Sequence, residues 1–235
     1  MPITVSLVTS GTAQVDAAPM TAAFTPDQNQ LYLLAVLSRR AASEPATPTA
    51  TGAGLTWTAI NNQGYPVAVV QKLTVFRALG AGPSNGALTI DFADEPQEDV
   101  AWQVLRVTGV SPSHASQGVV QSAKNSTSAA ASLTITLAAF GSANNGTIGF
   151  FGIGAGAVDV TPGTGFTELS ETTVGSVTLQ SQWRNDNDTT VDATFALNAA
   201  GGIALEIALG TVSAATIGGG GFFPGGAPGY ISHSE

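Results

Sequence analysis

The segment from Val100 to Val110 reads Val-Ala-Trp-Gln-Val-Leu-Arg-Val-Thr-Gly-Val and is apolar on both faces of an extended chain. Its apolar side chains divide between the two faces, with Ala101, Leu105 and Val107 on one and Val100, Trp102 and Val104 on the other. A strand of this kind usually lies in the middle of a sheet that is covered on each side. We therefore predict a central strand, which ends at Gly109 before a Ser-Pro turn.

The rest of the chain repeats this pattern of short apolar or alternating segments, separated by Gly, Pro, Asn and Asp. The further strands that we expect cover residues 3–10, 20–25, 30–38, 55–60, 71–78, 87–92, 118–124, 132–137, 147–153, 166–171, 177–184, 190–197 and 202–209, with one edge strand within 41–54. Turn signals every 8 to 15 residues favour a sandwich or jelly roll. The predicted fold class is all-β: a jelly-roll-like antiparallel β-sandwich of about a dozen strands over residues 1–212.

Composition excludes several classes of function. Hydrophobic residues make up 43% of the 235 residues, which is enough for a core, and only 10% are charged. Seven basic residues face sixteen acidic ones, so we expect no nucleic-acid binding. There is no cysteine for a disulfide or a thiolate site. We also expect no secretion signal and no membrane-spanning segment, because the start of the chain lacks a basic, apolar leader and no run of about 18 apolar residues occurs.

The C-terminal residues 213–235 differ from the rest and are predicted to form an extended arm. Four glycines at 218–221 are followed by a segment with two prolines, and such a composition does not make a regular element. The segment nevertheless carries four large apolar residues, Phe222, Phe223, Tyr230 and Ile231. Leaving such side chains in water costs about 1.5 to 3 kcal/mol each relative to burial. They are therefore expected to bind, either on the arm's own domain or, as we predict, in grooves on another subunit.

The order of these segments resembles a jelly-roll-like β-sandwich domain found in bacteriophage virion proteins and in some bacterial surface proteins. The resemblance covers roughly residues 1–212 and rests on Leu31 to Leu37, Gly54 to Trp57, Leu73 to Leu79, Gly86 to Ile90, Val107 to Val110 and Thr161 to Leu169. It implies a structural or binding protein of a virion, and it transfers no catalytic residues.

An acidic cluster is the first candidate for a site, with Asp91, Asp94, Glu95, Glu98 and Asp99 in one predicted loop. Closely spaced carboxylates can hold Ca²⁺, although the ordered spacing of a loop that wraps the ion by itself is missing. The alternative is a solvated loop that keeps a sheet edge from pairing, and we favour it. The segment from Asn185 to Asp188 has the composition of a hairpin turn.

The aromatic residues Trp57, Trp102, Trp183, Tyr32 and Tyr65 are the second candidate, as a platform on which sugar rings stack. The alternative, which the alternating pattern favours, is that they pack in the core. Catalysis has little support. Only His114 and His233 are present as imidazole bases, and no nucleophile elbow or phosphate loop occurs.

The expected function is therefore non-enzymatic: a virion structural protein, most concretely a capsid decoration (cement) protein or another head or tail accessory subunit. Its expected partners are copies of itself and a major capsid or tail protein. It would be made in the host cytoplasm and lie on the virion surface, with no cofactor. The alternative is a carbohydrate-binding module or adhesin, such as one on a phage tail, which would bind a host glycan and use Ca²⁺ in the acidic loop.

Overall fold

The computed structural model describes residues 2–16, 20–65, 70–80, 82–110 and 118–210, and these contain strands and no helix. The strands are β1 (Thr4–Asp16), β2 (Met20–Phe24), β3 (Leu31–Arg39), β4 (Thr49–Gly52), β5 (Thr58–Tyr65), β6 (Gln71–Leu79), β7 (Gly86–Asp91), β8 (Gln97–Thr108), β9 (Val119–Thr136), β10 (Gly146–Ile153), β11 (Thr161–Pro162), β12 (Thr167–Val174), β13 (Val177–Arg184) and β14 (Thr190–Ile207). All of the strand pairs are antiparallel. The predicted all-β fold class is confirmed.

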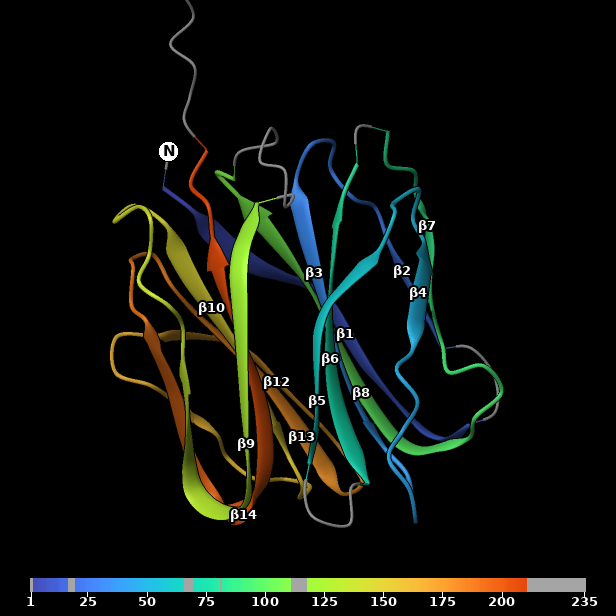
Figure 1. Ribbon diagram of the computed structural model, residues 1–235. Helices are drawn as coiled ribbons and strands as arrows, with labels where there is room; N and C mark the ends of the chain where they lie inside the picture. The colour runs from blue at the N-terminus through green and yellow to red at the C-terminus, as the bar shows by residue number, and fades with distance from the viewer. Residues whose placement is uncertain (1, 17–19, 66–69, 81, 111–117, 211–235) are drawn as a thin grey trace, which may run out of the picture.

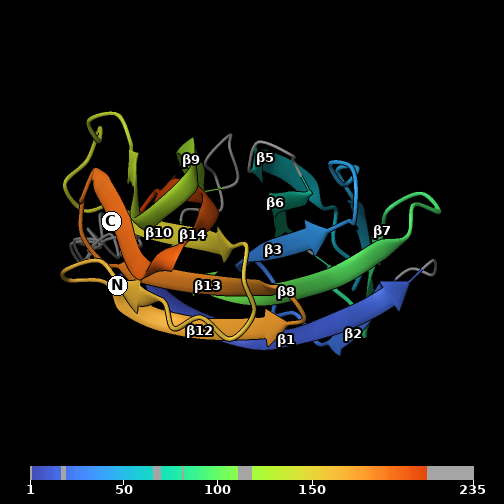
Figure 2. The ribbon, with the colours of Figure 1, turned by 90° about the horizontal axis from the view of Figure 1, so that it is seen from below.

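The strands form four layers (Figures 1 and 2). Inner sheet 1 has the order β1-β8-β3-β6-β5, and outer sheet 1, with the order β2-β7-β4, covers its outer face. Inner sheet 2 consists of the first half of β9, the second half of β14, then β10, β13 and β12. Outer sheet 2 consists of the second half of β9, the first half of β14, and β11. The two inner sheets pack face to face in the middle of the stack.

Three hydrophobic cores fill the three spaces between these layers, and β8 takes part in two of them. Ala101, Leu105 and Val107 lie in the central core between the inner sheets. Val100, Trp102 and Val104 lie in the core between inner sheet 1 and outer sheet 1. The prediction that this strand is central and covered on both sides is therefore confirmed, and β3, buried from Leu31 to Ser38, is a second case of the same kind.

Two pairs of predicted strands are each a single long strand. The segments expected at 118–124 and 132–137 join as β9, and those at 190–197 and 202–209 join as β14. Register shifts between Thr194 and Ala200 let the β9–β14 pair bend into an arch while the two strands stay paired. The arch carries the pair from inner sheet 2 into outer sheet 2. The local sequence contains turn residues there, but the pairing partner keeps the chain extended.

The segment from Asn185 to Asp188 is a connection and not a hairpin turn. It follows β13 and precedes β14, but β10 lies between these two strands in the sheet. The connection crosses the start of β10, where the Thr147 hydroxyl lies 3.0 Å from the carbonyl oxygens of Asp186 and Asp188. The turn composition correctly indicates that the chain changes direction here. It does not indicate which strand the following strand pairs with.

The two halves of the chain have the same topology. In the first, β1 pairs with β8, β2 with β7 and β3 with β6, which are three of the four strand pairs of an eight-stranded jelly roll, while β5 pairs with β6 instead of β4. In the second, β9 pairs with β14 along both of its halves and β10 pairs with β13, while β11 takes the place of β4. The molecule thus consists of two jelly-roll-like repeats whose inner sheets face each other. Just beyond the ends of β8 and β14, Val110 and Leu209 form an isolated antiparallel β-bridge.

Matching rows of paired residues align the repeats. Thr58, Arg77, Leu33 and Leu105 form a row across inner sheet 1, and Thr167, Trp183, Ile148 and Leu205 form the matching row of inner sheet 2. The register shift in β5 falls between Ala59 and Asn61, and that in β12 falls between Glu168 and Ser170, which is the same place. The residues skipped there, Ile60 and Leu169, both pack against the central core.

Candidate interaction surfaces

The acidic loop between β7 and β8 is stabilised by separate contacts to several parts of the first repeat. Asp91 Oδ1 accepts a hydrogen bond from the Ala93 backbone N–H at 2.8 Å. Glu95 Oε1 accepts one from the Ala46 N–H at 2.8 Å and lies 3.1 Å from an Arg40 guanidinium nitrogen. These are the contacts of an ordered turn, and they orient the carboxylates toward the protein itself.

Asp94 is exposed in the loop before β8, whereas Glu98 and Asp99 lie on opposite faces of that strand. Glu98 forms an ion pair with Arg39. Asp99 is 4% exposed and accepts hydrogen bonds from Gln14 Nε2 at 3.2 Å and from the Ser176 N–H at 3.0 Å. Ser176 belongs to the β12–β13 turn of the second repeat, so Asp99 joins the two repeats. Within the described residues, no three His, Asp or Glu side chains gather as metal ligands. The Ca²⁺ site stays a prediction that this arrangement does not favour.

A second group of carboxylates, which the sequence did not single out, lies at the edge of inner sheet 2. Burial raises the pKa of Glu168, and the negative charges of Glu171 and Asp159 raise it further. Glu171 accepts a hydrogen bond from the Val160 N–H at 3.0 Å. These acids repel one another, and the Glu171 contact stabilises the segment before β11.

The aromatic residues do not form one platform. Tyr32, Tyr65 and Trp102 are buried, with exposures of 1%, 2% and 6%. Trp57 and Trp183 are half-buried and pack against different cores. The preferred prediction, that the strand aromatics are core residues, is confirmed for the three buried ones, and the glycan alternative loses the exposed face on which it depended.

Tyr65 connects the two repeats from the end of β5. Its ring lies over the cross-strand pair Gly152 and Gly201 of inner sheet 2, where a Cβ on Gly201 would lie 2.2 Å from a ring carbon. Only glycine at both positions leaves room for the ring. Complete burial raises the pKa of the phenol well above its ordinary value.

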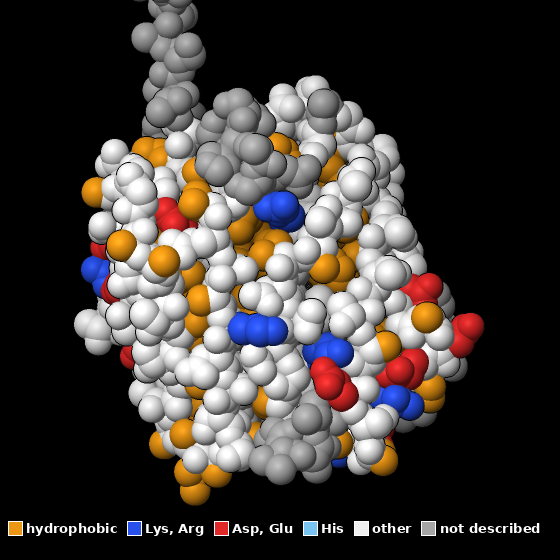
Figure 3. All heavy atoms as spheres, in the orientation of Figure 1, with side chains coloured by type: hydrophobic (Ala, Val, Ile, Leu, Met, Phe, Trp, Pro, Cys, Tyr) orange, Lys and Arg blue, Asp and Glu red, His pale blue; other side chains and the backbone are white. Residues whose placement is uncertain are grey.

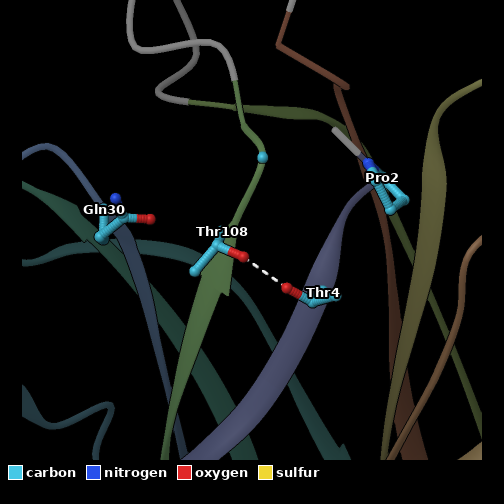
Figure 4. A pocket seen from close by; sticks show the side chains of 5 residues that line it. Pro2, Thr4, Gln30 and Thr108 are labelled. Atoms are coloured by element: carbon cyan, nitrogen blue, oxygen red, sulfur yellow. Dashed lines mark hydrogen bonds between the residues drawn. The ribbon is translucent and has the colours of Figure 1, made fainter.

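A shallow pocket of about 320 Å³ lies at the end of the sandwich where the N-terminus and the last described residues meet (Figure 4). Its lining is Pro2, Thr4, Gln30, Thr108 and Gly109. The hydroxyls of Thr4 and Thr108 form a hydrogen bond with each other. Gly210 donates a hydrogen bond from its backbone N–H to the Gly109 carbonyl at 2.6 Å, so the C-terminal arm continues from beside this pocket. The lining has no ionisable side chain and offers no acid–base chemistry.

The opposite end of the molecule has an uncharged tip where the β9–β14 arch bends. We call Ala129, Ala131, Ala196 and Leu197, which are all exposed, the apolar tip. Leu197 is 71% exposed, more than Leu7, Val8 or Val120, the other exposed large hydrophobic residues of the described ranges. The apolar tip lies at the lower end of the views in Figures 1 and 3. Sequence reasoning missed it because Leu197 sits in a segment with an ordinary strand pattern.

Several predicted residues lie outside the described residues. These are the arm residues Phe222, Phe223, Tyr230 and Ile231, and the two histidines, His114 and His233. Their predicted roles stay predictions.

Comparisons with known proteins add no relative. No protein-family description matches the chain, and no curated protein and no solved structure shows significant similarity to it. Among the described residues, no helix has the length and apolar character needed to cross a membrane.

Proposed function

We propose that this protein is a virion structural protein, most concretely a capsid decoration subunit or another head or tail accessory subunit, which acts through contacts with other proteins. One observation carries the proposal. A four-layered sandwich ends beside its own N-terminus at Gly210, and the sequence from Thr211 to Ser232 is uncharged and carries Phe222, Phe223, Tyr230 and Ile231. Aromatic anchors of this kind supply most of the binding energy in protein interfaces.

The surface of the described residues also supports a role in contact rather than in chemistry. The pocket at the N-terminal end is lined by no ionisable side chain, and Asp91, Glu95 and Glu98 contact arginines or backbone N–H groups of the protein itself. Two jelly rolls that share one core form a stiff block, which suits a subunit on the outside of a particle. The proposed partners are copies of this chain and the major capsid or tail protein.

Particles purified from the native source test the proposal. After density-gradient centrifugation, we expect the protein to sediment with intact particles at a fixed copy number per major capsid protein, measured by quantitative mass spectrometry. Electron microscopy with a labelled antibody should then locate it on the particle surface. Recovery of the protein as a free monomer, with none on the particles, would contradict the proposed function.

A further inference from the structure

The apolar tip occupies a position for which the chain contains its own comparison. Asp91 of β7 pairs with Thr49, and Thr194 of β14 pairs with Thr161, so these pairs are equivalent in the two repeats. The next two residues are Phe-Ala in both cases: Phe92 and Ala93 in the first repeat, Phe195 and Ala196 in the second. Both phenylalanines are buried, with exposures of 5% and 7%. The third residue is Asp94 in the first repeat and Leu197 in the second.

This comparison separates what the fold needs from what the second repeat adds. The buried phenylalanine is common to both repeats and anchors the bend to its core. After it the backbones diverge: the chain turns at Asp94, with a φ of 63°, whereas β14 stays extended through Leu197. Leu197 is 71% exposed, so no core requires its apolar side chain. Around Leu197, the segments 125–131 and 194–199 contain no charged residue. Leu197 is thus the most exposed large hydrophobic side chain of the described residues and lies in an uncharged surface, which makes it the best candidate among them for a contact with another protein.

The C-terminal arm is the part of the chain whose chemistry matches the apolar tip. From Thr211 to Ser232 the arm has no charged residue and no histidine. The chain has a net charge of −9, so two copies repel each other over most of their surfaces. A contact between the arm and the apolar tip brings together two uncharged segments and avoids this repulsion.

The position of the arm favours a contact between copies. The arm begins after Gly210, at the end of the sandwich opposite to the apolar tip (Figure 1). Residues 197–210 span about 43 Å if extended, at about 3.3 Å per residue. Phe222 lies 12 residues beyond Gly210 and reaches at most about 43 Å. Phe222 therefore reaches the apolar tip of its own chain only if the arm is fully extended. A second copy stacked end to end places its apolar tip beside the start of the arm.

We propose that the apolar tip of one copy binds Phe222 and Phe223 from the C-terminal arm of the next copy, so that copies join head to tail. The inference rests on the proposed function, in which the arm makes the contacts of assembly, and it names the partner surface. A head-to-tail contact uses two different patches on each copy. It therefore continues into a ring or a string rather than stopping at a symmetric dimer.

A mixing experiment tests this contact. One variant carries Leu197→Asp, which copies the residue of the first repeat and keeps the arm. The other ends at Thr216, which removes the arm and keeps the apolar tip. We expect each variant alone to sediment as a monomer in analytical ultracentrifugation at concentrations where the intact chain forms larger species. A 1:1 mixture should form a heterodimer and nothing larger, because only one arm and one tip remain intact.

Leu7→Asp is the matched control, because Leu7 is also an exposed leucine, at 39% exposure, and lies in β1, outside the β9–β14 pair. It should assemble like the intact chain. Circular dichroism should show an unchanged thermal midpoint for both aspartate variants, since neither side chain is in a core.

Three results would overturn the inference: assembly of the Leu197→Asp variant like the intact chain, assembly of the truncated chain like the intact chain, or a mixture that stays monomeric. An intact chain that stays monomeric at every concentration, which is the result expected of an arm that binds the tip of its own chain, would also overturn it. Sedimentation of each variant with particles distinguishes this failure from that of the proposed function. A protein that binds particles without joining copies keeps the proposed function and loses the head-to-tail contact.

Discussion

Replacing Trp102 by alanine removes the largest side chain from the core between inner sheet 1 and outer sheet 1. The indole is 6% exposed and lies over Gly11, its cross-strand partner in β1, where an added Cβ would lie 2.2 Å from ring atom Cζ2. Gly11 has no side chain that could move into the vacated space. We therefore expect a loss near the upper part of the range of about 3 to 5 kcal/mol that is typical of buried Trp→Ala changes.

Urea denaturation followed by circular dichroism measures this loss, with Trp57→Ala as the control, because Trp57 packs at the margin of the same core and is only half-buried. The control should lose clearly less. A loss under about 1 kcal/mol for Trp102→Ala would mean that the side chain is exposed in solution. It would refute the covered-strand reasoning and restore the aromatic platform for glycans.

A double-mutant cycle tests the ring-on-glycine contact itself. Gly11→Ala should destabilise the intact chain, because the new Cβ meets the indole ring. In the Trp102→Ala background the same change should cost much less, because the ring is gone. Equal costs in the two backgrounds would show that Trp102 does not lie over Gly11.

Three further predictions follow from the same structure. Tyr65 should make the free energy of unfolding fall above pH 10 and should not change it below pH 10. The pKa of Tyr65 in the folded chain is raised above the ordinary value of 10.0, so the phenol ionises first in the unfolded chain. Urea titrations should show a weaker fall in Tyr65→Phe, and an identical fall would contradict the assignment. A circular permutant that starts at Gly118, ends at Val110 and joins Gly210 to Pro2 through a linker as long as segment 111–117 keeps the buried Ile3. It should fold with the strand content of the parent, because Gly118 beside Ala208 and Thr4 beside Thr108 are equivalent places in the two repeats. An unfolded circular dichroism spectrum would contradict the equivalence. Deleting residues 217–235 should leave the thermal midpoint of the monomer nearly unchanged while assembly weakens, and a large fall in the midpoint would mean that the arm belongs to its own core.

Short sequence similarities survive at equivalent positions of the two repeats, but they are too weak to identify the repeat by themselves. Trp57-Thr58-Ala59-Ile60 corresponds to Phe166-Thr167-Glu168-Leu169, and Phe92-Ala93 corresponds to Phe195-Ala196. Each match consists of an aromatic residue followed by one to three residues that differ or are common in strands, and many unrelated strands share such short patterns. Only the common register of the sheets shows that these segments are equivalent.

Local periodicity by itself determined the all-β class, the approximate positions of most strands and the two-sided burial of β8, because side chains alternate in any extended segment whatever its partner. Which strands pair was decided only by the tertiary structure. In the pair of β1 and β8, for example, Thr4 lies opposite Thr108, about a hundred residues later in the sequence. Alternation within a strand contains no information about which strand lies beside it. For the same reason the acidic cluster looked like one site in the sequence, yet in the fold Arg39 pairs with both Glu98 and Asp99, and Asp99 also accepts a hydrogen bond from the turn of the other repeat. The exposed Leu197 is also a product of the fold: its strand pattern is that of a buried residue, and the bend of the arch leaves it in solvent.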